Sequence, residues 1–326
     1  MAIRFGVSPI AWINDDMPEL GGDTPVETVL ADARDLGFTG IELGGKFSKD
    51  PAVLEPLLAA HGLGLVGGWY SGNLLSHGAR DEIASLQSHL ALLKAMRCTV
   101  FVHAETSNAV HGDRARPLAA TPQLDAGAWA QFGERLTEVA DYIASQGLRY
   151  AYHHHLGTVV DGLDDLENFM RYTGATVGLT VDTGHAALAG VDPVELIRSF
   201  PERVAHVHCK DIRGEVFRDV MLRHGSFLEG VLAGMFTVPG DGDLDYDAVL
   251  RALAGIGYGG WIVVEAEQDP AKANPRRYAR VGLRTLRQAA AAAGLAEAGL
   301  HVCEPCDARE PRDACGPRDA CEPRDE

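Results

Sequence analysis

Four segments in the second half of the chain each end a short apolar run with side chains that bind metals or transfer protons. Their sequences are YHHH at 152–155, VDTGH at 181–185, HVHCK at 206–210 and VVEAE at 263–267. A mixture of imidazole and carboxylate groups suits Mn²⁺, Co²⁺, Zn²⁺ or Fe²⁺ better than Ca²⁺ or Mg²⁺. The four segments therefore predict a divalent-metal centre, provided that the fold brings their ends together.

The alternation of side chains along a strand narrows the set of ligands. Alternate residues point to the same face, so His153 shares a face with His155, and His206 with His208. The two glutamates of the last segment are related in the same way. With one donor from each segment, the predicted ligands are His153, Asp182, His208 and Glu265.

Each of these residues also has a purely structural interpretation. A single histidine on a barrel strand is more often a hydrogen-bonded core residue than a ligand, and Asp182 could cap a helix that begins at Thr183. Glu267 and Asp211 could orient a ligand histidine without binding the metal themselves. The agreement of all four segments favours the metal site over these alternatives.

The elements that must position these residues alternate along the whole chain. Short β-rich runs predict eight strands, at 3–9, 39–44, 63–69, 98–104, 148–155, 177–183, 204–210 and 261–267. Helical patterns lie between them, including those at 25–36, 79–96, 126–146, 246–256 and 274–293. Eight alternating units predict a single (β/α)8 TIM barrel of the α/β class, with its active site at the carboxyl ends of the strands. An open doubly wound sheet is the alternative, but SPIAWINDD after the first strand cannot form that fold's glycine-rich phosphate loop.

Two regions fall outside this alternation. The long connection at 212–243 is expected to contain a short helix and to cover the barrel mouth. Residues 298–326 repeat PRDAC and combine proline with alternating charge, which predicts a disordered tail after a barrel domain at 1–297. A zinc knuckle built on His301, Cys303 and Cys306 is the alternative, but the other cysteines of the tail follow the repeat and not a ligand spacing.

Composition excludes several classes of partner. The net charge of −17 over 326 residues opposes nucleic-acid binding, which needs clustered lysine and arginine. The chain lacks an apolar run of about 18 residues, so no membrane span is predicted, and its start has no features of a signal peptide. Only Cys98 and Cys209 precede the tail, which fits a reducing compartment, so a cytoplasmic location is expected.

Seven longer motifs resemble those of the inosose dehydratases, a family within the xylose-isomerase-like superfamily of sugar isomerases and epimerases. They are NDDMPELGGDTP (14–25), GIELGGKF (40–47), HHHLGT (153–158), VDTGHAALAG (181–190), HVHCKDIR (206–213), FTVPGDG (236–242) and VVEAEQDPAKANP (263–275). The chain departs from the sugar isomerases on the fifth strand, where His153 replaces a glutamate. His155 is therefore the alternative ligand on that strand.

The resemblance implies an activity and cofactors. Inosose dehydratases are carbon–oxygen lyases that remove water from 2-keto-myo-inositol, giving a trihydroxycyclohexane-dione in myo-inositol catabolism. Such enzymes are described as needing Mn²⁺ or Co²⁺, with glutathione also implied as a cofactor. A polyol ketone is therefore the expected substrate. A ketose isomerase or 3-epimerase is the alternative, because it shares the first step, removal of the proton next to the carbonyl. Homo-oligomers are expected by analogy with other barrels of the superfamily.

Eliminating water from a hydroxyketone requires a base for that proton and an acid for the departing hydroxyl. By analogy with the epimerases Glu265 could serve as the base, and His185 is a second acid or base because it lies beside Asp182. The expected catalytic residues are Glu265, His185 and His155, and the expected substrate-binding residues are Lys210, Arg213, Glu105, Trp69 and Asn14. For Lys210 and Arg213 the alternative is a surface ion pair with Asp211.

Overall fold

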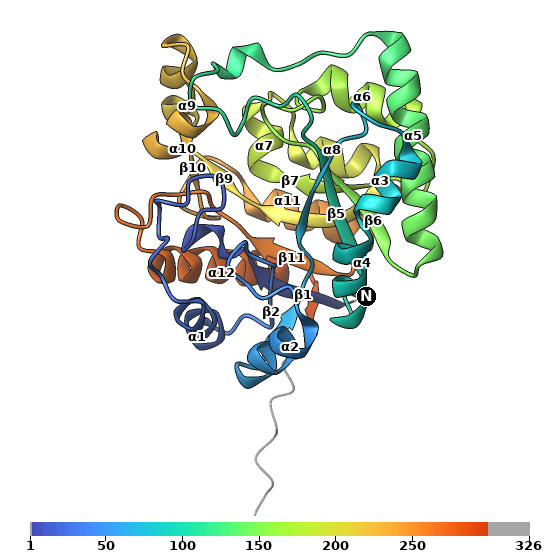
Figure 1. Ribbon diagram of the computed structural model, residues 1–326. Helices are drawn as coiled ribbons and strands as arrows, with labels where there is room; N and C mark the ends of the chain where they lie inside the picture. The colour runs from blue at the N-terminus through green and yellow to red at the C-terminus, as the bar shows by residue number, and fades with distance from the viewer. Residues whose placement is uncertain (1, 299–326) are drawn as a thin grey trace, which may run out of the picture.

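In the computed structural model, which describes residues 2–298, parallel strands curl into a barrel with helices around it (Figure 1). The strands are β1 (Ala2–Val7), β2 (Gly40–Ile41), β3 (Gly64–Leu65), β4 (Trp69–Gly72), β5 (Val100–Glu105), β6 (Arg149–His153), β7 (Gly178–Asp182), β8 (Val204–Cys209), β9 (Asp211–Ile212), β10 (Phe236–Thr237), β11 (Trp261–Val264) and β12 (Ala296–Glu297).

The helices follow the strands in the expected alternation. They are α1 (Val26–Leu36), α2 (Pro51–Ala60), α3 (Ala79–Ser85), α4 (Gln87–Ala95), α5 (Ala126–Ser145), α6 (Leu163–Tyr172), α7 (Thr183–Leu188), α8 (Pro193–Ser199), α9 (Gly214–Leu222), α10 (Phe227–Ala233), α11 (Tyr246–Gly255) and α12 (Pro275–Ala292). Short 3₁₀ turns occupy Pro9–Ala11, Leu118–Ala120 and Pro201–Arg203.

The order of the strands closes the barrel. They run β3-β2-β1-β11-β8-β7-β6-β5-β4, and every neighbouring pair is parallel. The two ends of this order, β3 and β4, are consecutive in the chain and together form the third predicted strand. The predicted (β/α)8 barrel is therefore confirmed.

The third strand is interrupted where the sequence predicted a continuous run. The break covers residues 66–68, between β3 and β4, and includes Gly67 and Gly68. A Cβ at Gly68 would lie 2.8 Å from the Cβ of Leu43, so the glycine allows the two segments to pass closely. The backbone N–H of Leu43 donates to the carbonyl of Gly67 over 2.9 Å, which carries the hydrogen bonding across the break.

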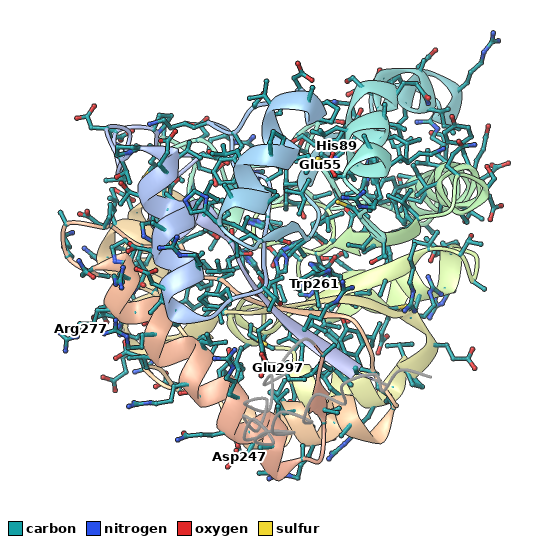
Figure 2. The ribbon with its side chains drawn as sticks, turned by 90° about the horizontal axis from the view of Figure 1, so that it is seen from below. Glu55, His89, Asp247, Trp261, Arg277 and Glu297 are labelled. Atoms are coloured by element: carbon teal, nitrogen blue, oxygen red, sulfur yellow. The ribbon has the colours of Figure 1, made fainter. Side chains whose placement is uncertain are left out.

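Trp261 fills the barrel interior at the start of β11. Its indole packs with Val66 and Val263, and the guanidinium of Arg4 lies 4.1 Å from the ring centre. Gly40 leaves room for the indole, because a Cβ there would lie 2.5 Å from it. Figure 2 shows Trp261 near the centre of the molecule, whereas Arg277 projects at the edge. The amino-terminal end of the barrel is thus plugged, and the site must open at the other end.

Two long connections lie over the carboxyl ends of the strands. The connection after β8 folds into α9, α10 and the antiparallel pair β9–β10, so the expected short helix is present as two helices. The connection between β5 and α5 crosses the top of Figure 1 and joins this layer, since the N–H of Leu118 donates to Gly225 over 2.9 Å. A small apolar core that includes Phe227, Val231 and Phe236 holds the layer together.

Two further predictions concern the carboxyl-terminal tail and membrane-spanning helices. The predicted tail at 298–326 lies, apart from Ala298, outside the described residues, so its disorder and the domain boundary stay predictions. Within residues 2–298, no helix is long and apolar enough to cross a membrane.

Candidate metal centre and active site

The four predicted ligands converge at the carboxyl end of the barrel. His153 ends β6, Asp182 ends β7, His208 lies in β8, and Glu265 directly follows β11. Parallel pairing sets Asp182 beside His208 on neighbouring strands. All four side chains are buried.

The donor atoms of His153, Asp182 and His208 lie close enough to one another to hold a metal ion, and Glu265 lies beside His208. His153 Nε2 lies 3.2 Å from His208 Nδ1 and 3.6 Å from Asp182 Oδ2. His208 Nδ1 lies 3.8 Å from Asp182 Oδ2 and 2.8 Å from Glu265 Oε2. Ligands at about 2.1 Å in a tetrahedral site are about 3.4 Å apart. The donor set therefore fits a divalent cation that accepts both nitrogen and oxygen ligands.

Asp182 supplies a second observation in favour of a cation. Its Oδ1 accepts the backbone N–H groups of Gly184 and His185, each over 2.9 Å, and so caps α7. Its Oδ2 is buried and has no hydrogen-bond partner among the described residues. Burying a carboxylate oxygen without a partner is costly, and a bound cation would remove that cost.

Lys210 is fully buried beneath this centre. Its ammonium lies 2.8 Å from Glu265 Oε1, 2.6 Å from Glu267 Oε1 and 3.7 Å from Asp182 Oδ2. Burial alone would raise the pKa of Glu265, but Lys210 and His208 hold this pKa well below its ordinary value. Lys210 therefore keeps the ligand carboxylates charged from below, and it is not part of a surface ion pair.

Glu42, just after β2, belongs to the same cluster and was not singled out from the sequence. Its Oε1 accepts from His206 Nε2 over 3.1 Å and from His208 Nε2 over 3.0 Å. Burial alone would raise the pKa of Glu42, but the two imidazoles lower it to about 2. The available signal was its place at the carboxyl end of the second strand, which matches the place of Glu265 on the eighth.

A cavity of about 160 Å³ opens over these groups. Of the predicted site residues, Trp69, His153, His155, His208 and Glu265 line it. The other polar residues that line it are Ser8, Asp15, Asp16, Glu42, Ser71, His111 and Glu267. The lining combines many hydrogen-bond acceptors with one aromatic wall, which suits a ligand with several hydroxyl groups.

His155 presents one ring nitrogen to this cavity. Its Nδ1 lies 2.8 Å from the carbonyl of Leu156, and because a carbonyl only accepts, this nitrogen carries the hydrogen. Its Nε2 is then left with a lone pair. The ring of His185 lies behind it, with ring centres 3.8 Å apart, and does not line the cavity. Burial lowers the pKa of both histidines well below the ordinary value, which favours their neutral forms.

Glu267 lies between Lys210 and the cavity. Its Oε1 accepts from Lys210, and its Oε2 is buried with no partner among residues 2–298. Burial raises the pKa of Glu267 to about 7, although Lys210 opposes this shift. Such a group can exchange a proton near neutral pH.

Arg213 lies outside the cavity. Its guanidinium donates to the carbonyl of Gly234 over 2.9 Å and to Thr237 Oγ1 over 3.1 Å, and it pairs with Asp241 over 2.5 Å. These contacts tie together the segment after β8. The structure thus places Arg213 in the layer that covers the barrel mouth.

Glu105 and Asn14 are also buried away from the cavity lining. Glu105 accepts the backbone N–H groups of Leu74 over 2.5 Å and Ser107 over 2.9 Å. Asn14 Oδ1 accepts the N–H of Met17 over 2.7 Å. Both side chains shape the loops around the mouth. Asn14 holds the turn that carries Asp15 and Asp16 into the lining.

Comparison with known proteins agrees with this geometry. A family model described as a xylose isomerase-like TIM barrel matches residues 30–289. The chain belongs to the xylose isomerase-like TIM-barrel family. Among solved structures of this fold, an L-ribulose 3-epimerase superposes with a TM-score of 0.65 at 16% identity, covering 90% of this chain and 96% of that one. At that identity the likeness shows the fold alone.

Closer relatives within this family align with nearly the whole chain. The rhizopine catabolism protein MocC of Rhizobium meliloti is 42% identical over 95% of each chain. The inosose dehydratase of Geobacillus thermodenitrificans is 37% identical over 88% of this chain and 97% of its own. The predicted resemblance to inosose dehydratases is therefore confirmed, and the predicted enzyme class, a carbon–oxygen lyase, agrees with it.

Proposed function

We propose that the protein dehydrates a small polyol ketone, 2-keto-myo-inositol, to a trihydroxycyclohexane-dione in myo-inositol catabolism. The observation that carries the proposal is the similarity to inosose dehydratases, which extends over 88% of the chain and includes the strands that supply the converging donors. The acidic lining, rich in hydrogen-bond acceptors, supports an uncharged substrate with many hydroxyl groups.

His153, Asp182, His208 and Glu265 would hold the metal, for which Mn²⁺ or Co²⁺ is proposed. When bound, such an ion polarises a ketone oxygen and stabilises the negative charge that follows removal of the neighbouring proton. Lys210 beneath the site holds the glutamate ligand in place through its 2.8 Å contact.

His155 is the best-placed base for the proton next to the ketone. Its Nδ1–H is fixed on the carbonyl of Leu156, so its Nε2 is free to accept a proton at the cavity. Glu267, whose Oε2 has no protein partner in the described part of the chain, would protonate the departing hydroxyl. Glu265 suits ligation better than proton transfer, because both its oxygens are engaged by Lys210 and His208.

The remaining groups would orient the substrate. Trp69 is partly exposed at the mouth, and its ring can pack on the apolar face of a carbocycle. Asp15 and Asp16 offer carboxylate oxygens to hydroxyl groups, and Asp15 is held in place by the N–H of Gly45 over 2.9 Å. His185 packs behind His155 and acts as a positioning residue for it.

A spectrophotometric dehydration assay tests the proposal. Chelator-stripped protein is compared with protein resupplied with Mn²⁺ or Co²⁺, on 2-keto-myo-inositol and, in parallel, on ketohexoses. Metal-dependent formation of the conjugated dione is expected. Turnover of a ketohexose without dione formation from inosose would transfer the function to the isomerases and 3-epimerases. The assay is run with and without added glutathione, which tests the glutathione requirement that the resemblance implies.

A step in rhizopine catabolism is the second candidate. It is favoured by the 42% identity to MocC over 95% of both chains, which exceeds the identity to the inosose dehydratase described above. Rhizopine is therefore included as a substrate in the same assay. Metal-dependent consumption of rhizopine with no dione from inosose would select this candidate.

A further inference from the structure

The two ring nitrogens of His208 have different neighbours. Its Nδ1 faces the proposed ligands, at 2.8 Å from Glu265 and 3.2 Å from His153. Its Nε2 faces away from them, toward Glu42 Oε1 at 3.0 Å. Glu42 therefore contacts the imidazole on the side opposite to the proposed metal.

This arrangement determines which nitrogen can bind a metal. An ionised carboxylate only accepts hydrogen bonds, so the Nε2 of His208 must carry a hydrogen. Nδ1 faces an ionised carboxylate as well, Glu265 Oε2 at 2.8 Å, so a metal ion would bind at Nδ1 by replacing its hydrogen, while the hydrogen on Nε2 stays on Glu42. A carboxylate behind a ligand histidine fixes the ring and increases its basicity, and losing such a partner commonly costs 10–100-fold in metal affinity.

His206 holds Glu42 in the required place. It lies on the same face of β8 as His208, and its Nε2 donates to the same oxygen, Glu42 Oε1, over 3.1 Å. All three side chains are buried. The carboxylate therefore has little freedom to turn away from His208.

We propose that Glu42, anchored by His206, is a positioning residue that holds His208 in the orientation and tautomer required for metal binding through Nδ1. Glu42 thereby sets the affinity of the site for its metal. The inference rests on the metal site of the proposed function, but it does not depend on which substrate the enzyme uses.

A second metal ion is the competing explanation for this cluster. The donor atoms of Glu42, His206 and His208 lie close enough to one another to hold an ion of their own. The two direct hydrogen bonds to Glu42 favour the positioning role. The number of ions bound per chain separates the two explanations.

The test uses the full chain, stripped of metal, without substrate. The dissociation constant for Co²⁺ is measured by competition with a chelator in the wild type, Glu42→Gln and Glu42→Ala. We expect Glu42→Ala to weaken binding about 100-fold and Glu42→Gln about 10-fold, because the amide oxygen still accepts from Nε2 but carries no charge. One ion per chain is expected in the wild type. In the Zn²⁺-loaded protein, ¹⁵N shifts of His208 should show a hydrogen on Nε2 in the wild type and a loss of this single tautomer in Glu42→Ala.

Glu82→Gln is the matched control. Glu82 is another buried glutamate that faces two histidines, His77 and His103, but it lies in α3 outside the metal-binding cluster. Its removal should leave Co²⁺ affinity within about twofold. Circular dichroism at the assay pH establishes that each variant is folded, and Glu42→Gln keeps the test decisive if Glu42→Ala does not fold.

Three results would overturn the proposal: wild-type affinity in folded Glu42 variants, equal weakening in Glu82→Gln, or two ions per chain in the wild type. Because no substrate is present, the outcome is independent of the dehydration assay. A protein inactive on inosose could still show the Glu42 effect.

Discussion

His153 ends β6 and His155 lies two residues beyond it, yet their ring nitrogens face different groups. His153 Nε2 lies within 3.6 Å of both Asp182 and His208, whereas His155 is fixed by its hydrogen bond to Leu156. The sequence left His155 open as the alternative ligand, and these distances distinguish the two histidines. The donor separations favour His153.

Replacing each histidine by glutamine should separate the two roles. His153→Gln removes a proposed ligand and should weaken Co²⁺ binding by more than about 100-fold, beyond the usual effect of losing an outer partner. His155→Gln should bind Co²⁺ within about fivefold of the wild type but lose most of its kcat, since it removes the proposed base. Chelator competition and steady-state kinetics measure both effects. The reverse pattern would make His155 the ligand.

At the scale of single residues, the donors could be predicted because each lies at or just after the carboxyl end of a strand whose pattern is local. Glu42 could not be identified in the same way. Its partner His208 is 166 residues away, and only the closed barrel brings the second and seventh strands within reach of one side chain. Arg213 and Glu105 were expected to bind substrate from their positions, but that expectation could not include the backbone groups that hold them.

Among the elements, α3 is attached to the barrel through a buried carboxylate. Glu82 accepts from His77 over 2.5 Å and from the N–H of Asn73 over 3.1 Å, and it lies 3.5 Å from His103 of β5. Burial alone would raise the pKa of Glu82, but its histidine partners and the Asn73 N–H lower it to about 2. A lowered pKa means that the folded state favours the ionised form, so this contribution to stability is present above pH 4.5.

Glu82→Gln should therefore lower the free energy of unfolding by up to about 3 kcal/mol at pH 7, and the difference from the wild type should shrink as pH falls from 4.5 toward 2. Urea unfolding at pH 7, 4.5 and 3 measures it. The control is Glu55→Gln, at an exposed glutamate (labelled in Figure 2) that pairs with Arg97 and should change stability by less than about 1 kcal/mol. A difference that stayed constant with pH would contradict the assignment.

The layer over the barrel mouth depends on a few polar anchors. The carboxylate of Asp211 accepts the N–H groups of Gly240, Gly242 and Leu244 over 3.0–3.2 Å. Gly240 has a φ of 84°, and a Cβ at Gly242 would lie 2.3 Å from a backbone oxygen, so both glycines are needed for this turn. Arg213 holds the preceding residues of the same segment.

Arg213→Ala should loosen this segment. Losing charged hydrogen bonds of this kind commonly costs about 1.5–3 kcal/mol each, so faster hydrogen exchange at 234–242 and a lower Tm are expected. The matched control is Arg218→Ala, an exposed arginine of α9. If Arg213 instead binds substrate, KM would rise while exchange in this segment stayed at the wild-type rate.

The overall fold could be predicted from the sequence, but the breaks within its elements could not. Alternating runs of apolar residues indicated all eight barrel strands, and the helix at 126–146 was expected within one residue of α5. The predicted helix at 79–96 is instead two helices, α3 and α4, that meet at Leu86, where φ is −79° and ψ is −5°. The split third strand depends on packing between distant segments, such as Leu43 against Gly68, which local periodicity does not record.

For the whole molecule, the strands of the barrel and the helices between them lie within residues 2–298. The last element, β12, pairs with β1 at Ala2 and Ile3, so the described fold ends within residues 2–298. A chain that stops after Ala298 should therefore keep the Tm of the full chain to within about 2 °C, and it should keep kcat and a single bound metal ion. Calorimetry, the dehydration assay and metal analysis on both chains make the comparison. One fewer zinc ion in the shortened chain would instead favour the zinc knuckle at His301, Cys303 and Cys306. A lower Tm with unchanged metal content would show that the tail packs on the barrel.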